Sequence, residues 1–262
     1  MKKIKTILIW CLNKVKAFFP WYKNLYKGRA WYTKTLIGFA SCIAAFIIYL
    51  GMVDINFLWL FGKSPGFYTI MNPETHEASE IYSADGVLIG KYFNENRTPV
   101  AYEDVNPVFW KALIDTEDER FYSHHGIDYT GLVGAVKDAV MHHDARGAST
   151  ITQQLAKNMF RVRTDYSTGL LGKIPGVRML IMKSKEWIIA TKLEITHSKK
   201  EIITMYANTV DFGSNAFGIK TAAKTYFNCT PKELTTEQAA VLVGMLKATT
   251  YYNPIANPNN SI

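Results

Sequence analysis

The first residues whose types and spacing could do chemistry are the acids around Glu117. Asp115, Glu117, Asp118 and Glu119 fall within five residues, and the last three begin the stretch EDERFYSHHGID that occupies 117–128. Carboxylates packed together in a cleft raise the pKa of one of them, and a glutamate with a pKa near neutrality can act as a general base. The alternative is an ordinary acidic turn in solvent. The acids alone therefore make Glu117 a candidate, and further support has to come from other segments.

A second polar run, GASTITQQLAKN at 147–158, offers hydroxyl, amide and ammonium groups over about three helical turns. Gly147 precedes it, and a helix N-terminus there would present free N–H groups to an anion. Gln153, Gln154 and Lys157 share a helix face by their i, i+3 and i, i+4 spacing. The alternative is a solvated outer face, although glutamate and lysine are more usual there. The run therefore indicates a surface that binds a polar or anionic ligand.

A third candidate is the pair formed by Lys183 and Glu186, which are i, i+3 neighbours. The functional interpretation is a cation beside a second carboxylate, able to handle a charged leaving group. The alternative is a surface ion pair that contributes little. The histidine pairs at 124–125 and 142–143 are weaker metal candidates, because adjacent residues on an element point apart. We expect His124 to orient its loop by hydrogen bonding.

Apolar spacing predicts the helices that must carry these side chains. The i, i+3, i+4 pattern is clear at Leu132, Val133 and Val136. Helices are predicted at 107–120, 128–141, 149–159, 179–196, 199–209, 216–227 and 235–248. Ser198 before Glu201 and Thr235 before Gln238 predict capping boxes. The part of the chain that carries the polar segments is therefore expected to be mostly α-helical.

Two segments between the helices have other signatures. Asp85-Gly86 separates two β-type runs within 81–93 and predicts a small hairpin. Residues 161–177 contain three glycines, Pro175 and few periodic apolar residues. They predict a long surface loop, and loops of that length are often functional.

The positive charge of the chain is concentrated at its N-terminus. The formal net charge is +8, yet residues 1–34 hold nine of the 30 Lys and Arg and no Asp or Glu, so that 21 basic residues face 22 acidic ones in the remainder. A nucleic-acid-binding domain would need its basic patch on the folded surface, so this distribution argues against one. It suits a segment held against anionic lipid headgroups.

A membrane segment follows the basic region. Residues 36–53 form a run of eighteen residues without a charge, which is about the minimum for a spanning helix. The positive-inside rule then places residues 1–34 in the cytoplasm and the chain after about residue 55 outside. A cleaved signal peptide is the competing interpretation, but the basic region is long for one and no clear small-x-small cleavage site follows. Only Cys229 of the three cysteines is exported, so the outer part has no partner for an intrachain disulfide.

The polar segments resemble the motifs of peptidoglycan glycosyltransferases, glycosyltransferase family 51. This family comprises the glycosyltransferase domains of class A penicillin-binding proteins and the monofunctional transglycosylases. Its patterns E-D-x-x-F-x-x-H-x-G-x-D, G-x-S-T-I-T-Q-Q-L-x-K-N, R-x-x-x-x-K-x-x-E and S-K-x-E-I-x-x-x-Y-x-N occur in the family's order at 117–128, 147–158, 178–186 and 198–208. A fifth match runs from Gly218 to Pro254, so the resemblance covers about residues 80–255.

The resemblance implies a mainly α, lysozyme-like glycosyltransferase domain with a small β-hairpin, preceded by one N-terminal transmembrane helix. The expected organisation is a basic cytoplasmic tail at 1–34, a signal-anchor helix at 35–54, a juxtamembrane linker at 55–79 and the glycosyltransferase domain at 80–262. The chain stops soon after Asn253-Pro254 and holds no Ser-x-x-Lys acylation motif. This end favours a chain truncated before a transpeptidase domain, with a monofunctional enzyme as the alternative.

The resemblance also implies a reaction and a set of site residues. Lipid II would be polymerised into glycan strands with β-1,4 links, with Glu117 as the catalytic base and Glu186 as the second catalytic glutamate. Substrate-binding roles would fall to Asp118, Phe121, His124, Ser149, Thr150, Gln153, Gln154, Lys157, Asn158, Arg178 and Lys183. A divalent metal, Mg or Mn, is the one cofactor implied. The implied partners are lipid II, the growing glycan chain, membrane lipid and proteins of cell-wall synthesis, with no nucleic acid.

Two other functions remain open at this point. A lytic muramidase shares the lysozyme-like fold and a lone glutamate, but the cations expected at a pyrophosphate and the membrane anchor argue against it. A membrane scaffold for wall assembly with a degenerate site is the non-enzymatic alternative. The intact Glu117, Lys157 and Arg178 argue against a degenerate site.

Overall fold

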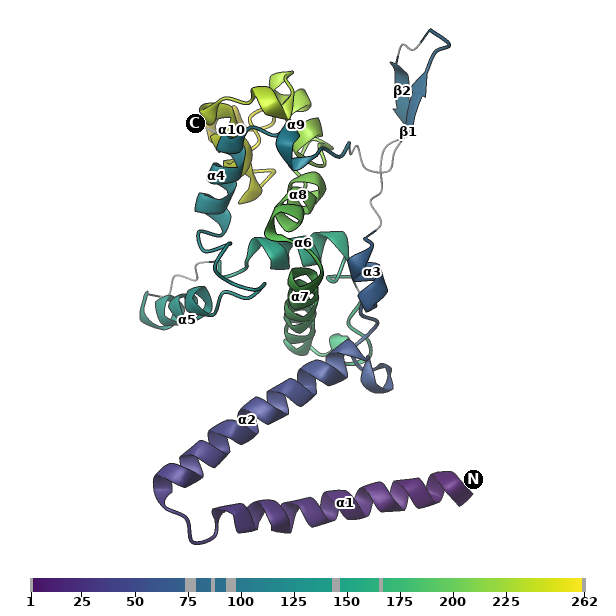
Figure 1. The fold of residues 1–262 in the computed structure, drawn as a ribbon, viewed down its shortest axis with the longest axis vertical. Coiled ribbons are helices and arrows are strands. Elements are labelled where there is room, and N and C mark those ends of the chain that lie inside the picture. The colour runs from purple at the N-terminus through teal and green to yellow at the C-terminus, as the bar shows by residue number, and fades with distance from the viewer. Residues whose placement is uncertain are drawn as a thin grey trace. The chain divides into compact units, whose positions relative to one another are not determined.

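The computed structural model describes residues 2–73, 79–85, 88–92, 98–142, 147–164 and 167–260 (Figure 1). The chain forms two compact units, Met1–Met52 and Val53–Ile262. The first contains the N-terminal helices, and the second contains every residue named above as a site candidate.

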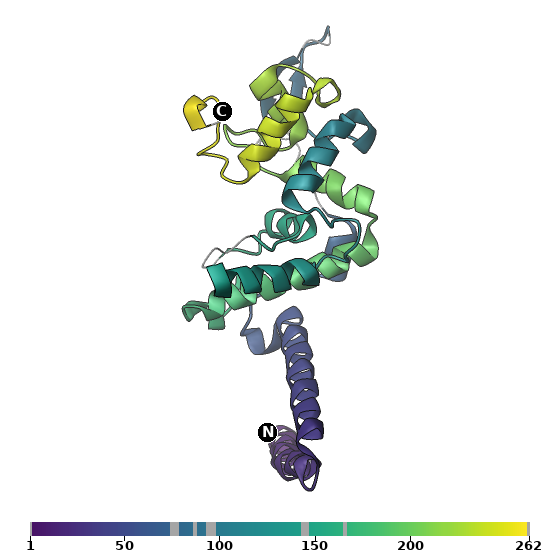
Figure 2. The ribbon, with the colours of Figure 1, turned by 90° about the vertical axis from the view of Figure 1, so that its left-hand side faces the viewer.

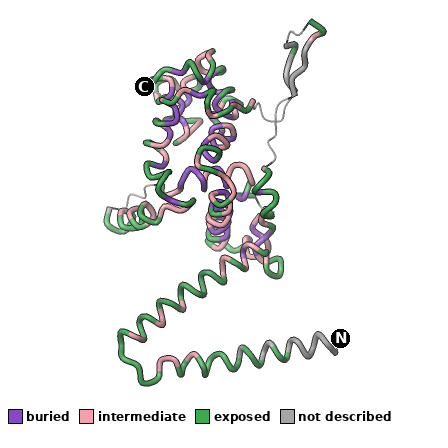
Figure 3. The backbone as a smooth tube through the Cα atoms, viewed as in Figure 1, coloured by how far each residue is buried: buried purple, intermediate pink, exposed green. Residues whose placement is uncertain are grey.

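The first unit is built from two long helices, α1 (Lys2–Tyr26) and α2 (Trp31–Asp54), the second of which ends in the second unit. Gly28 lies between them at φ 71°, a backbone conformation that L side chains rarely adopt. α2 has 24 residues and is long and apolar enough to cross a membrane. Most of its residues are exposed, and Val53 is its one buried residue (Figure 3). The apolar run at 36–53 thus lies within a single helix.

One small sheet is present, where the sequence predicts a hairpin. Strands β1 (Ser79–Tyr82) and β2 (Leu88–Tyr92) pair antiparallel, with Ser79 opposite Tyr92 and Ile81 opposite Gly90. The register shifts between Ile81 and Tyr82. The predicted turn residue Gly86 lies outside the described residues.

All seven helices predicted for the exported part are present. Their bounds are α4 (Pro107–Glu117), α5 (Tyr129–His142), α6 (Ile151–Met159), α7 (Val177–Thr196), α8 (Lys199–Thr209), α9 (Ile219–Phe227) and α10 (Thr236–Leu246). A short helix not predicted, α3 (Phe67–Met71), precedes them, and 3-10 turns lie at 57–59, 102–104, 171–173, 231–233 and 258–260. The second unit is therefore mainly α, as expected.

The helix ends follow local capping chemistry. Ser198 and Glu201 form a complete capping box on α8, and Thr235 and Gln238 form one on α10, as predicted. α4 ends at Glu117 rather than at the predicted residue 120, because Asp118 has φ −161°. α9 begins at Ile219 rather than 216, because Gly218 has φ 79° and does not continue a helix.

Helix α6 lies at the centre of the second unit. It packs against α7 on one side and α8 on the other, while α4 packs along α10 (Figures 1 and 2). Ile151, Leu155 and Ala156 of α6 are fully buried, and each large apolar side chain buried in this way stabilises the fold by about 1.5–3 kcal/mol. The helix that carries the polar run 147–158 is therefore fixed in the core, and its polar side chains hold defined positions.

The predicted surface loop at 161–177 is partly buried, so that prediction is wrong for Val162 and Thr168, which are each 2% exposed. The loop packs against residues 60–62. Leu171 N donates to Leu60 O at 2.9 Å. A Cβ atom on Gly169, which has φ 60°, would lie 2.3 Å from Gly62 N. The close approach of these two backbones requires glycine, and it explains why this glycine-rich stretch is not free in solvent.

Candidate active site

Glu117 is held by a chain of hydrogen bonds from the core. It is the last residue of α4 and is half-buried. Gln154 Nε2 donates to Glu117 Oε2 at 2.7 Å, and Tyr206 Oη donates to Gln154 Oε1 at 3.0 Å. Burial, together with the negative charge of Glu117, raises the pKa of Tyr206, so the phenol stays protonated and remains a donor. The Glu117 carboxylate is thereby oriented while part of it stays accessible.

Asp118 ties the acidic turn to the start of α6. Its carboxylate accepts hydrogen bonds from His124 Nε2, 3.0 Å from both oxygens, and Oδ2 also accepts from Ile151 N at 2.9 Å. Gly126 N donates to His124 Nδ1 at 3.2 Å, which assigns the proton of the neutral ring to Nε2. Asp118 and His124 are each 7% exposed. The pair therefore holds the N-terminus of α6 beside Glu117.

The same helix start is fixed by Gly126. Its carbonyl oxygen accepts from Thr150 Oγ1 at 2.8 Å and from Gln153 Nε2 at 3.0 Å. Thr150 is also the N-cap of α6 and accepts from Gln153 N at 3.2 Å. The polar run thus uses part of its hydrogen-bonding capacity to position itself.

A charge cluster surrounds Glu186 on α7. Glu186 is 1% exposed, and it accepts from Lys183 Nζ at 3.0 Å and from Arg163 Nε at 2.8 Å, one cation on each carboxylate oxygen. Lys183 Nζ also donates to Ser149 Oγ at 2.8 Å and to Gln153 Oε1 at 3.0 Å. Glu186 therefore orients two cations, and one of them reaches the start of α6.

Lys157 adds a third cation to this cluster. It is half-buried on α6 and, within the described part of the chain, its ammonium donates no hydrogen bond. Burial lowers its pKa, and the charge of Arg163 lowers it further, whereas Glu186 raises it. The charge of Lys183 also lowers the pKa of Lys157, and the charge of Glu117 also raises it. Lys157 is thus a partly desolvated donor with hydrogen-bonding capacity left for an anion.

The predicted site residues fall into two groups by exposure. Asp118, Phe121, His124, Thr150 and Gln153 are buried, so in this structure they shape the site. Ser149, Gln154, Lys157, Asn158 and Lys183 are half-buried and are closer to solvent.

The structure adds one arginine to the predicted set. Arg178 lies in the first turn of α7 and is half-buried, and its substrate-binding role stays a prediction. The arginine bonded to Glu186 is Arg163, which sequence reasoning missed because it falls in the predicted loop, outside any motif. Tyr206 was part of a motif but carried no assigned role.

A pocket of about 440 Å³ opens beside Glu117. It is bounded by the end of α4, by α5 and by the residues before α6, including Glu117, Arg120, Asp128 and Ser149. Arg120 Nη2 lies 2.6 Å from Asp128 Oδ2 across one edge. The pocket therefore meets the acidic turn on one side and, through Ser149, the charge cluster on the other.

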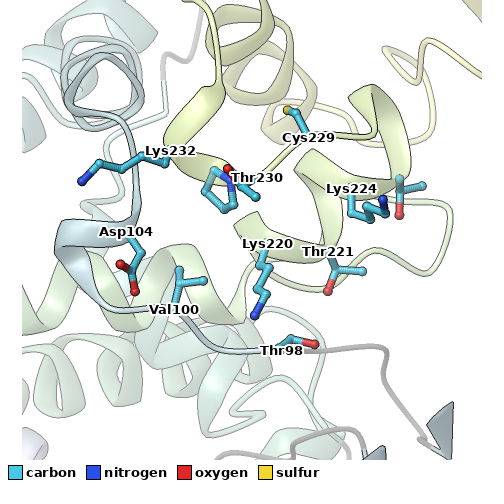
Figure 4. A pocket seen from close by; sticks show the side chains of 11 residues that line it. Thr98, Val100, Asp104, Lys220, Thr221, Lys224, Cys229, Thr230 and Lys232 are labelled. Carbon is cyan, nitrogen blue, oxygen red and sulfur yellow. The ribbon is translucent and has the colours of Figure 1, made fainter. Parts of the chain in front are cut away.

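A second pocket, of about 630 Å³, lies at α9 (Figure 4). Lys220, Lys224 and Lys232 line it, but their ammonium groups point in different directions (Figure 4). Lys224 Nζ donates to Asn228 Oδ1 and Lys232 Nζ to Glu103 O, each at 2.6 Å. Asp104 is the one carboxylate among the described residues that line it. The pocket beside Glu117 is therefore the better candidate for acid–base chemistry.

The residues around Glu186 do not fit a divalent metal. Both Glu186 oxygens accept hydrogen bonds from cationic side chains, and a third cation, Lys157, lies in the same cluster. A divalent ion prefers several oxygen ligands free of such competition. No group of three or more His, Cys, Asp and Glu side chains in the described ranges is arranged to hold a metal. We derive no chemical step through a metal here.

Comparison with known proteins shows which family the chain resembles. The family model described as Transglycosylase matches residues 85–262. Penicillin-binding protein 1A of Escherichia coli (strain K12) is 37% identical over 199 residues, which cover 76% of this chain and 22% of that protein. Penicillin-binding protein 1F of Bacillus subtilis (strain 168) is 35% identical over 222 residues, 84% of this chain and 28% of that protein. The chain thus spans only about a quarter of the length of these relatives.

Proposed function

The chain belongs to the transglycosylase family, and on that premise we propose that it polymerises lipid II into the glycan strands of peptidoglycan. The observation that carries the proposal is the arrangement of two kinds of group around α6. A half-buried glutamate with oriented oxygens lies at one end, and three cations gather around Glu186. One group suits proton removal from a sugar hydroxyl, and the other suits a pyrophosphate leaving group.

In the proposed reaction Glu117 removes the proton of the acceptor 4-hydroxyl. The acceptor oxygen forms a bond to C1 of the donor sugar while the bond from C1 to the pyrophosphate oxygen breaks, with inversion, to give a β-1,4 link. The proton stays on Glu117 until it passes to water, and undecaprenyl pyrophosphate leaves as an anion. Gln154 supports this role because its amide fixes one Glu117 oxygen and leaves the other for the substrate.

We assign the leaving group to Lys157, whose ammonium can donate hydrogen bonds to it, and to the fixed positive charge of Lys183, whose three donors are bonded to Ser149, Gln153 and Glu186. Fixed cations stabilise charge as it develops and lose little energy to reorganisation. Glu186 would act as a positioning residue, since it is buried and holds Lys183 and Arg163 rather than facing solvent. Asp118, Phe121 and His124 would act indirectly, by holding the start of α6.

We also propose the membrane arrangement. α2 would cross the bacterial cytoplasmic membrane once, because it is long and apolar enough. The basic residues of 1–34 would stay in the cytoplasm by the positive-inside rule, leaving the second unit on the outer, periplasmic face, within reach of a lipid-linked sugar. Other proteins of cell-wall synthesis would be partners there.

The test is polymerisation of lipid II by the purified full chain in detergent, followed by separation of the glycan products. We expect polymer from the wild type and loss of activity by about 10²–10⁴-fold in Glu117→Gln. Glu103→Gln is the matched control, because Glu103 is an exposed acid on the 3-10 turn 102–104, and it should polymerise normally.

Three outcomes would contradict the proposal. Retained activity in a folded Glu117→Gln variant would remove the role given to Glu117. Release of fragments from purified cell wall would indicate a muramidase. Binding of cell-wall proteins with no turnover of lipid II by the wild type would indicate a scaffold.

A further inference from the structure

Lys185 is a fully buried lysine that the proposed reaction does not use. It is 0% exposed. Its Nζ donates to Gly62 O at 2.9 Å, Lys63 O at 2.7 Å and Ser167 O at 2.6 Å. These three bonds use all three donors of the ammonium group. We call this arrangement of Lys185 Nζ and the three carbonyl oxygens the Lys185 junction.

The Lys185 junction joins three parts of the chain that are distant in sequence. Gly62 and Lys63 follow the 3-10 turn at 57–59, Ser167 belongs to the loop before α7, and Lys185 is on α7 itself. The backbones of 60–62 and 169–171 also meet directly, through the glycine contact described above. The segment that leaves α2 is therefore attached to both the loop and α7.

The loop side of the junction leads to the charge cluster. Ser167 Oγ donates to Val162 O and, at 2.7 Å, to Thr164 O, the carbonyls on either side of Arg163. Arg163 Nε in turn donates to Glu186 Oε1. Lys185 and Glu186 are adjacent but face different sides of α7. A continuous series of contacts thus runs from Lys185 through Ser167 and Arg163 to Glu186, which is the next residue after Lys185 in the chain.

Burial of the charged Lys185 ammonium costs free energy. Burial lowers the pKa of Lys185 to about 8, which means that the surroundings disfavour its charge. Among the described residues no carboxylate lies within ion-pair distance of it, and the counter-charge that acts on it is Asp54. The carbonyl dipoles are what offset the lost hydration. An apolar side chain of similar length would fill the space without this cost but would hold none of the three oxygens.

We propose that Lys185 is a positioning residue, which couples the segment leaving α2 to the active site by fixing Ser167 and hence the Arg163–Glu186 pair. The inference rests on the proposed function, because it assigns Lys185 a role in the same reaction. It goes further by making residues 60–63, which lie next to the membrane candidate helix, part of what sets the geometry of the cation cluster.

The chain offers a control on the same face of α7. Lys192 is seven residues after Lys185 and binds Asp54 Oδ1 at 2.6 Å, so it also ties α7 to the segment leaving α2. Both partners are partly exposed, at 21% and 31% for their side chains, and among the described residues their hydrogen bonds do not reach the loop. Lys192→Met should therefore loosen the same segment without disturbing Arg163.

The experiment compares initial rates of lipid II polymerisation by full-chain variants. We expect Lys185→Met to lower kcat by about tenfold, as for loss of one charge-assisted interaction, with KM changed less than about twofold, and Lys192→Met to match the wild type. Arg163→Gln should give a similar loss. In the Arg163→Gln background, Lys185→Met should cost less than about twofold more, because both changes break one path. An unchanged kcat in Lys185→Met, or losses that multiply in the double variant, would overturn the inference.

Amide hydrogen exchange tests the Lys185 junction independently of the polymerisation rate. Lys185→Met should speed amide exchange in 60–63 and 167–171 while α8 and α10 keep wild-type protection. If Lys185→Met does not fold, Ser167→Ala interrupts the same path by removing the hydroxyl bonds to Val162 O and Thr164 O, and it should reproduce the kcat loss. A wild type that fails to polymerise lipid II refutes the proposed function alone. An active wild type with unchanged exchange in Lys185→Met refutes the Lys185 junction alone.

Discussion

Replacing Asp118 by asparagine tests whether the acidic turn holds α6 in place. The Asp118 carboxylate satisfies two buried donors, His124 Nε2 and Ile151 N. Asparagine has one oxygen, so its amide group would face one of these donors with another N–H. His124 cannot relieve the conflict by moving its proton to Nδ1, because Gly126 N already donates to that nitrogen.

The expected loss follows from these contacts. One buried donor left unsatisfied costs about 1–3 kcal/mol, and removing a negative charge from the N-terminus of α6 costs about 0.3–1 kcal/mol more. We therefore expect Asp118→Asn to lower the free energy of unfolding by about 1.3–4 kcal/mol. For a domain of this size that corresponds to a fall in Tm of roughly 3–16 °C.

The assay is thermal unfolding of the full chain in detergent, monitored by intrinsic fluorescence. Asp115→Asn is the matched control, since Asp115 forms an i, i+4 pair with Lys111 in which both side chains are more than half exposed, at 56% and 77%. Such a pair contributes only about 0.3–0.5 kcal/mol. If Asp118→Asn melts within about 2 °C of this control, the claim that Asp118 positions α6 is wrong.

Three further predictions concern other contacts of the second unit. Tyr206→Phe removes the donor to Gln154 Oε1 and should lower kcat by about fivefold, as for one hydrogen bond of about 1 kcal/mol, in the lipid II assay; an unchanged rate would show that Gln154 orients Glu117 without it. Ser198→Ala removes the α8 capping box and should cost about 1 kcal/mol of stability in denaturant unfolding, with wild-type kcat. Because burial holds the native pKa of Lys185 near 8, below its ordinary value of 10.5, the unfolded chain binds more protons between these two pH values, so stability from this group rises with pH. The unfolding free energy of the wild type minus that of Lys185→Met should therefore increase from pH 8 to pH 10. A constant value would contradict the buried position of the ammonium.

The order and type of the helices could be predicted from the sequence. Apolar periodicity predicts seven of them. Both bounds of α8 agree with the prediction, and its first residue is fixed by a capping box, which is a local signal. The candidate membrane helix is likewise read from eighteen uncharged residues. Motif spacing also identified the two helices, α6 and α7, that carry the cation cluster.

The sequence was less informative where a contact with a residue distant in sequence, and not a local preference, sets the backbone conformation. α4 was predicted to continue to residue 120, but Asp118 leaves the helix and its carboxylate reaches Ile151 N, 33 residues away. The loop at 161–177 has the composition of a surface loop, yet contacts with residues 60–63 and Lys185 bury part of it. Neither contact has a short-range signal.

The sequence by itself determined which segments hold the candidate site residues, because helix periodicity, caps and motif spacing act over a few residues. Only the tertiary structure decided what each polar side chain does. Packing of α6 between α7 and α8 turned Asp118 and His124 into buried supports, gave Glu186 the guanidinium of Arg163, and left Lys157 without a hydrogen-bond partner among the described residues. Burial and pairing depend on which chain segments meet in space, and that is fixed by the whole core rather than by neighbours in sequence.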